Sequence, residues 1–439
     1  MKRYAYFIIF FIAFALLKVS ITISWALEDE VKETERVKLA LIIKEVLEKN
    51  PELASLRSRV YAFEERIDQA SAWDDPKIGL MFMNIPIDSF SFRDTDMTQK
   101  TLSFTQKVPF PGKTELRRII AEEAAGIDLE SYREMRLRIV KDVKKDYYNL
   151  AFIYKAIDIT SKNKAILEKF VKIAEAKYVV GKGLQQDVIK AQVEMSRMIE
   201  KLIALRQKKA SLIADLNMLM DRSPAAPMGK IEELEKKEID YTFEGLKTIS
   251  FKRSPVLKER GREIERYKYS LELAKKEYYP DFGLGITYGQ RDNSPVKGRT
   301  DFISGGISVN VPIWHKKKQG KKVSETVYLL NMAEDKYLSE KNKILFMIKD
   351  LMEKEEKTSQ LIDLFKTGII PQATQSLESA FAGYRVNKVD FLTLLHNQIT
   401  LFKYEIEYYR MIADHEIVLA ELEAVVGGDI AVARIQESE

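Results

Sequence analysis

Two segments of the chain alternate between apolar residues and small or polar residues with a period of two. In residues 282–290, Phe282, Leu284, Ile286 and Tyr288 fall on one side, and three glycines with Thr287 fall on the other. Residues 302–311 alternate in the same way. Such alternation predicts β-strands with one apolar face, and about ten residues suffice for a tilted strand to cross a bilayer. With the polar loop between them, they predict a β-hairpin over residues 281–311.

A less regular copy of this hairpin occupies residues 77–108. Its strands are predicted at residues 78–84 and 97–108, where Leu102, Phe104 and Val108 alternate with threonine and serine. Both return strands end at a proline, Pro109 or Pro312, which cannot donate to a strand ladder. Methionines 81, 83 and 97 are candidates for soft metal ligands, but methionine is more commonly lipid-facing or core filler.

The rest of the chain has a helical period. Residues 114–178 and 321–365 are rich in charge, with apolar residues at three- and four-residue spacing, such as Ile139, Val143 and Leu150. At about 1.5 Å per residue the first helix would reach on the order of 90 Å, which favours coiled-coil-like packing beside other helices. Further helices are predicted for residues 28–72, broken at Pro51, and for residues 391–426, ended by Gly427.

The chain is internally duplicated. Residues 176–193 and 382–399 share Tyr178 with Tyr384, Lys182 with Lys388, and Gln192 with Gln398, all at one offset. Each segment contains residues that tolerate a positive φ, which are glycines in the first and an asparagine in the second. Both are therefore predicted to be tips of antiparallel helical hairpins. The Gly-Lys-Gly of the first copy is not a phosphate-binding loop, because no strand precedes it.

The duplication defines the expected domains. Residues 1–26 are predicted to be a signal peptide, with Lys2 and Arg3 before a short apolar run; an uncleaved anchor is the alternative. Residues 27–225 form the first repeat, with its tip near 181–184, and residues 226–248 form a linker. Residues 249–428 form the second repeat, with its tip near 386–390, and residues 429–439 form a tail expected to be mobile.

Composition removes several functional classes. The chain has no cysteine, which excludes disulfides, thiolate metal sites and a cysteine nucleophile. Its formal net charge is only +5 among 439 residues, so a nucleic-acid partner is not expected. We find no nucleophile–base arrangement and no glycine-rich cofactor loop, and His315 and His415 lack ligand spacing. We therefore predict no enzyme, no cofactor and no metal site.

Four membrane strands cannot close a barrel, because two strand edges would face hydrocarbon with unmade hydrogen bonds. Three copies would supply twelve strands around an open lumen. The sequence thus predicts an oligomer with rotational symmetry whose strands contact membrane lipid.

The order of these elements, together with Tyr178-Val179-Val180-Gly181 at the first tip and Val-Pro-Phe-Pro-Gly at 108–112, resembles the TolC-like outer-membrane efflux factors. The resemblance covers nearly the whole mature chain. It implies an α+β membrane protein whose homotrimer forms a twelve-stranded outer-membrane β-barrel, in contact with outer-membrane lipid, and a long helical periplasmic tunnel. It also implies a passive channel that receives substrate from an inner-membrane pump of the RND type through a periplasmic adaptor.

The resemblance also assigns residues to two contact regions. The adaptor would meet the two tips, made of Val180, Gly181, Lys182, Gly183 and Leu184 in the first repeat and Val386, Asn387, Lys388, Val389 and Asp390 in the second. A periplasmic gate would involve Asp187, Tyr384, Thr393 and His396. Thr393 and His396 stand where the best-known member has acidic residues, so a cation-plugged acidic constriction is not expected. Histidine also changes charge near neutral pH, which makes a titrating gate a hypothesis.

The stretch Asn84-Ile85-Pro86-Ile87-Asp88, with Met97-Thr98, is more similar to the heavy-metal-efflux branch than to the drug-efflux branch. Two other classes of envelope protein remain as alternatives. A periplasmic adaptor would carry lipoyl-like and small β-barrel segments in place of bilayer-length hairpins. A coiled-coil structural protein would lack the alternation of residues 282–311.

Overall fold

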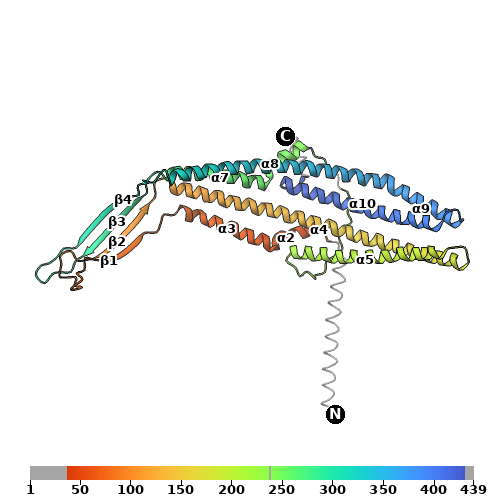
Figure 1. The fold of residues 1–439 in the computed structure, drawn as a ribbon, viewed down its shortest axis with the longest axis horizontal. Coiled ribbons are helices and arrows are strands. Elements are labelled where there is room, and N and C mark those ends of the chain that lie inside the picture. The colour runs from red at the N-terminus through yellow and green to blue at the C-terminus, as the bar shows by residue number, and fades with distance from the viewer. Residues whose placement is uncertain (1–36, 237–238, 431–439) are drawn as a thin grey trace, which may run out of the picture. The chain divides into compact units, whose positions relative to one another are not determined.

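The computed structural model describes residues 37–236 and 239–430 (Figure 1). The predicted signal peptide and most of the predicted tail lie outside these residues. Each repeat has the same order of elements: two short helices, a β-hairpin, a long helix and a returning helix. The first repeat contains α2 (Leu39–Lys49), α3 (Pro51–Ser71), β1 (Lys77–Met83), β2 (Gln99–Val108), α4 (Lys113–Val179) and α5 (Gln185–Leu219). The second contains α6 (Phe243–Arg253), α7 (Pro255–Lys276), β3 (Phe282–Gln290), β4 (Phe302–Val309), α8 (Gln319–Leu364), η1 (Phe365–Ile369), α9 (Ile370–Arg385) and α10 (Phe391–Val426).

A proline begins the second helix of each short pair, as the sequence predicted for Pro51. Pro51 and Pro255 lack the N–H that a continuous helix would need, so the helix ends and restarts there. At the first break Asn50 caps the new helix, since its Oδ1 accepts from the Leu53 N–H at 3.1 Å. The Asn50 Nδ2 also donates to the Leu219 carbonyl at 3.0 Å, which fixes the break to the end of α5.

The four strands form one antiparallel sheet in the order β1-β2-β3-β4. Its central pairing, β2 with β3, joins the two repeats, with Leu102 opposite Tyr288 and Phe104 opposite Ile286. The register brings most apolar residues of the four strands to one face, although Met81, Met83 and Phe302 lie on the other. Most side chains of the apolar face are exposed; they include Ile78, Leu80, Phe104, Leu284, Ile286, Ile303 and Ile307. The other face carries mainly glycine, serine and threonine. The fold class is thus confirmed, and a purely coiled-coil protein is excluded.

The two ends of this sheet differ. At one end, called the helical end, the strands connect to α3, α4, α7 and α8, and at the other, called the loop end, residues 84–98 and 291–301 connect strands within each hairpin (Figure 1). The helical end is fixed by Lys113, whose buried ammonium lies 2.8 Å from Asp281 Oδ1 and from the Tyr279 carbonyl oxygen. Since Asp281 also accepts from the Phe110 N–H at 2.9 Å, it ties the segment after β2 to the start of β3.

The chain divides into two compact units, and neither coincides with a repeat. Unit 1 comprises the described parts of residues 1–54, 134–254 and 343–439, and unit 2 comprises residues 55–133 and 255–342. Unit 2 contains the sheet, and unit 1 contains both helical tips. Each unit therefore draws segments from both repeats.

Helix α10 ends where the sequence predicted. Gly427 has φ 93° and caps the helix by donating to the Glu423 carbonyl at 3.0 Å.

Between α8 and α9, residues 365–369 form one π-helical turn just before Pro371. A wider turn accommodates a proline that a regular helix interior would exclude.

Candidate functional site: the helical tips and the strand loops

The first tip is a tight turn between α4 and α5. Its residues Val180, Gly181, Lys182, Gly183 and Leu184 are the five predicted from the sequence. Gly181 has φ 69°, a conformation that suits glycine, and the Lys182 N–H donates to the Lys177 carbonyl at 2.8 Å. The α4 helix is thereby closed by a left-handed cap.

The second tip, between α9 and α10, repeats this turn with different residues. Asn387 takes the left-handed position with φ 59°, and the Lys388 N–H donates to the Gly383 carbonyl at 2.9 Å. Asp390 then begins α10, since its side chain accepts from the Thr393 N–H at 2.6 Å. That hydrogen bond holds the pKa of Asp390 below its usual value, so the cap stays charged.

Each tip has one glycine where its chain crosses itself, but the glycine stands on opposite sides of the crossing in the two tips. In both turns, the residue before the shared tyrosine approaches the residue that lies five positions after that tyrosine. In the first tip these are Lys177 and Gly183, and a Cβ on Gly183 would meet the Lys177 Cβ at 3.0 Å. In the second they are Gly383 and Val389, and a Cβ on Gly383 would meet the Val389 Cγ2 at 2.5 Å. Each crossing therefore has room for only one side chain.

Lys177 binds the first tip to the second. Its Nζ donates to the Asn387 Oδ1 at 2.9 Å and to the Tyr384 carbonyl at 3.2 Å, and it lies 3.8 Å from the centroid of the Tyr384 ring. Two hydrogen bonds and a cation–π contact thus join the turns. Sequence analysis did not find this contact, because the partners are more than 200 residues apart. One sign of this contact was present in the sequence, which is that Lys177 in the first repeat aligns with Gly383 in the second.

Two of the four predicted gate residues lie together. Asp187 and Tyr384 both line an open cavity of about 660 Å³ between the tips, with Lys177, Lys182 and Asn387. Burial, and secondarily the charge of Asp187, raises the pKa of Tyr384, so its hydroxyl stays protonated. Tyr384 is only 7% exposed and packs against Phe391, with ring centroids 5.7 Å apart and the rings tilted by 58°.

The other two predicted gate residues lie elsewhere. Thr393 and His396 are both exposed on α10. His396 lines a second groove of about 860 Å³ between α5 and α10, with Leu392, Lys201 and Lys403 among its neighbours. The four gate residues therefore do not form one cluster within a single chain.

The tips have exposed apolar ends above a buried core. Val180, Leu184 and Val386 are 64%, 66% and 62% exposed. Behind them a core drawn from α4, α5, α9 and α10 includes Phe170, Leu167, Met198, Phe391, Leu394 and Phe402. Gln398, one of the residues shared by the repeats, is buried in this region and donates to Asn163 Oδ1 at 2.9 Å. A packed core thus lies beneath the exposed apolar side chains of the two tips, which form a candidate contact surface.

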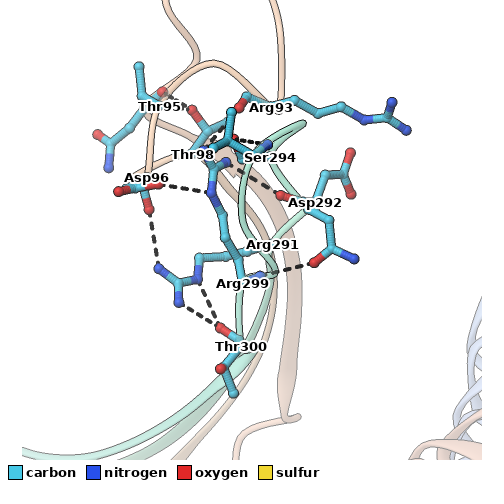
Figure 2. Close-up of polar contacts among 12 residues, drawn as sticks. Arg93, Thr95, Asp96, Thr98, Arg291, Asp292, Ser294, Arg299 and Thr300 are labelled. Atoms are coloured by element: carbon cyan, nitrogen blue, oxygen red, sulfur yellow. Dashed lines mark hydrogen bonds and ion pairs between the residues drawn. The ribbon is translucent and has the colours of Figure 1, made fainter.

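A second polar region joins the two loops at the loop end of the sheet (Figure 2). The Arg299 guanidinium, only 6% exposed, donates to the Arg93 carbonyl at 2.9 Å, and its Nε lies 3.0 Å from Asp96 Oδ1. Arg291 donates to the Thr300 carbonyl at 2.8 Å and to the Asp96 carbonyl at 3.2 Å. Both arginines come from the second hairpin, and each binds the loop of the first. The loops therefore form one connected rim.

A buried polar network in unit 1 was also missed from the sequence. His415 is fully buried, with Nε2 2.9 Å from Glu355 Oε1 and Nδ1 3.5 Å from Glu416 Oε1. Tyr241 donates to the other oxygen of Glu355 at 3.1 Å. The network joins α8, α10 and the segment before α6. An isolated histidine in a helical pattern gives no sign of such partners.

Two general findings concern the described residues. No group of three or more histidine, aspartate and glutamate side chains among them could hold a metal ion. None of the helices described is both long enough and apolar enough to span a membrane.

Comparisons with known proteins found a family match, a relative in sequence and similar solved structures. Residues 42–220 match the outer membrane efflux protein family. The cobalt-zinc-cadmium resistance protein CzcC of Cupriavidus metallidurans is 20% identical over 345 residues, which are 76% of this chain and 79% of that protein. The fold is similar to CusC, with a TM-score of 0.77, 12% identity, and 90% and 94% of the two chains covered. It is also similar to the outer membrane protein VceC of Vibrio cholerae, with a TM-score of 0.75, 18% identity, and 89% and 96% covered.

We expect Gly383→Ala to destabilise the second tip, because the new methyl group would overlap the Val389 side chain. Overpacking of this kind typically costs about 1–3 kcal/mol. Hydrogen exchange of the amides of residues 384–392 should therefore accelerate. Gly261→Ala is the control, because a Cβ at that helical position meets nothing within 4 Å. Adding Val389→Ala to Gly383→Ala should restore protection, and unchanged exchange in Gly383→Ala would refute the steric account.

We expect Arg299→Met to loosen both loops, because it removes the donor to the Arg93 carbonyl and the ion pair with Asp96. A hydrogen bond that involves a charged group contributes about 1.5–3 kcal/mol, so amide exchange in residues 84–98 and 291–301 should rise roughly tenfold. Arg93→Met is the control, since Arg93 contributes its backbone carbonyl to this contact. Equal exchange in the two variants would show that the guanidinium does not hold the rim.

Proposed function

We propose that the chain is an outer membrane efflux protein that forms the outer-membrane channel of a tripartite efflux system, and the match of residues 42–220 to the outer membrane efflux protein family supports this. In this system, an inner-membrane pump of the RND type delivers substrate through a periplasmic adaptor. The proposed location is the outer membrane, which is named in the matched family and in the outer membrane protein VceC. It provides a passive path and performs no chemical step on the substrate.

The sheet is the observation that carries this proposal. One face is apolar and exposed, whereas the other is lined by glycine, serine and threonine. This is the division that a membrane barrel needs, with lipid on one side and water on the other. In the described part of the chain, β1 and β4 each pair on one side only.

The open edges support a homotrimer. A strand edge in hydrocarbon costs several kcal/mol for each unsatisfied backbone group, so β1 of one copy should pair with β4 of the next. Three copies of a four-stranded sheet give twelve strands, between the eight that side chains fill and the sixteen or so of open porins. Cyclic symmetry closes this ring without leaving an edge.

The tips are proposed as the contact with the adaptor and as part of the gate. The exposed Val180, Leu184 and Val386 offer an apolar surface for the adaptor. Lys177 holds the two tips of one chain together, so it favours the closed arrangement of the periplasmic end. Asp187, Thr393 and His396 remain candidates for contacts between neighbouring copies.

Heavy-metal ions are the proposed cargo. The support is the name of the relative CzcC, a cobalt-zinc-cadmium resistance protein, together with the resemblance of residues 84–88 to the metal-efflux branch. A wide passive channel need not coordinate its cargo, so selection would lie with the pump.

Planar-bilayer recording tests the channel and its gate together. Wild-type protein should show small conductance, and Lys177→Met should raise it severalfold because the tips are released from one another. The matched control is Lys182→Met, which removes the same charge from the same cavity but not the hydrogen bonds to Asn387 and Tyr384. If neither wild type nor variant conducts, the channel is refuted; if the two variants behave alike, the Lys177 gate is refuted.

A deletion strain tests the cargo. Cells that lack the gene should become sensitive to cobalt, zinc or cadmium while keeping their resistance to bile salts and dyes. Complementation with the wild-type gene should restore metal resistance. Sensitivity to bile salts and dyes without metal sensitivity would contradict the proposed cargo.

A further inference from the structure

The turn that follows β4 carries a basic and aromatic surface that the channel proposal does not use. We call residues 313–318 the basic turn; they read Ile313, Trp314, His315, Lys316, Lys317 and Lys318. Ile313 and Trp314 are 72% and 75% exposed, although both are large apolar side chains. The three lysines are exposed as well.

The backbone holds the aromatic and basic parts of this turn together. The N–H groups of Lys317 and Lys318 both donate to the Trp314 carbonyl at 3.0 Å, and the Gly320 N–H donates to the His315 carbonyl at 2.7 Å. The indole and the lysines therefore belong to one folded turn. The depth at which the Trp314 indole lies in a membrane would largely determine the depth of the lysine backbone.

The lysines of the basic turn are not neutralised by the protein. Within the described residues, none of the three forms an ion pair. The first hairpin differs at the same end of the sheet, where Lys107 lies 3.1 Å from Asp74 and Lys113 lies 2.8 Å from Asp281. Among the residues that the structure describes, three consecutive lysines without an ion pair at the helical end are therefore a feature of the second hairpin.

The basic turn lies at the boundary of the apolar face. Exposed apolar residues continue from Ile307 and Val309 on β4 through Val311 to Ile313 and Trp314, and only then do the lysines begin. Exposed aromatic residues also precede β1 and β3 at this end, where Trp73 and Tyr279 are 56% and 53% exposed. Tryptophan and tyrosine concentrate at membrane–water interfaces, so these residues mark the level of the lipid headgroups.

We propose that the basic turn binds the phosphate headgroups of anionic phospholipids in the membrane leaflet nearest the helices. Trp314 and Ile313 enter the headgroup and acyl boundary, and the lysine ammonium groups reach the phosphates beside them. The partner is the lipid and not free phosphate, because the apolar side chains of the turn need acyl chains. This inference rests on the proposed function, since it requires the sheet to cross the membrane.

Native mass spectrometry of the detergent-purified full chain tests the preference. Wild-type protein should retain phosphatidylglycerol at least tenfold more tightly than phosphatidylethanolamine. Lys316→Gln/Lys317→Gln/Lys318→Gln should lower this preference roughly tenfold, and replacement of the same three lysines by arginine should keep it. Glycerol phosphate, which has the headgroup without acyl chains, should not compete.

The matched control is Lys169→Gln/Lys172→Gln/Lys208→Gln. It removes the same charge from exposed positions on α4 and α5, in unit 1, and should keep the preference for phosphatidylglycerol. An equal loss in the control would show an unspecific charge effect and overturn the proposal. An unchanged preference for phosphatidylglycerol in the basic-turn variant would also overturn the proposal. If that variant kept the preference but lost efflux, the basic turn would instead bind an acidic protein partner.

Trp314 fluorescence supplies an independent measurement. In a Trp25→Phe/Trp73→Phe background Trp314 is the sole tryptophan. Lipids brominated near the headgroup should quench it more strongly than lipids brominated near the end of the acyl chain. No quenching by either lipid in protein that conducts in planar bilayers would overturn the lipid site and leave the channel standing. Protein that neither inserts nor conducts would instead refute the proposed function.

Discussion

Backbone hydrogen bonds at the outer edges of the sheet constrain everything else about this chain. Strands β1 and β4 each have one partner in the described chain, and their apolar side chains face outward. In water, such edges would invite aggregation, and in lipid their unpaired groups would be expensive. Both costs disappear when copies of the chain pair edge to edge. The apolar face, the small residues opposite it and the need for neighbours are thus parts of one requirement.

The contacts at the helical tips differ from those of the sheet, because they hold the two tips together but can be broken. Lys177 illustrates this, because its contacts are polar and lie beside an open cavity, whereas the core behind the tips is apolar and closed. Polar contacts at a solvated position can be exchanged for contacts with water or a partner at modest net cost. In the gate proposed above, the buried core would preserve the helices while their ends rearrange.

Local pattern predicted those elements whose residues carry their own signal. Strand β3 has the predicted bounds because every second residue from Phe282 is apolar, and α10 ends where Gly427 accepts a positive φ. Strand β4 ends at Val309, two residues before the predicted end: the Asn310 N–H still donates to the Asp281 carbonyl in the same register, and Pro312, which has no N–H, follows. Contacts between distant segments had no such signal, so the Lys177 contact, the two loop arginines and the His415 network were found only in the folded chain.

The pairing of β2 with β3 has a consequence for the two repeats. A polypeptide with a single repeat would have an unsatisfied edge where β2 now meets β3, so it would have needed a second molecule of itself. Joining two such units in one chain makes this contact internal, so the two halves need not be identical. The crossings show this difference, because the glycine is Gly183 in one turn and Gly383 in the other.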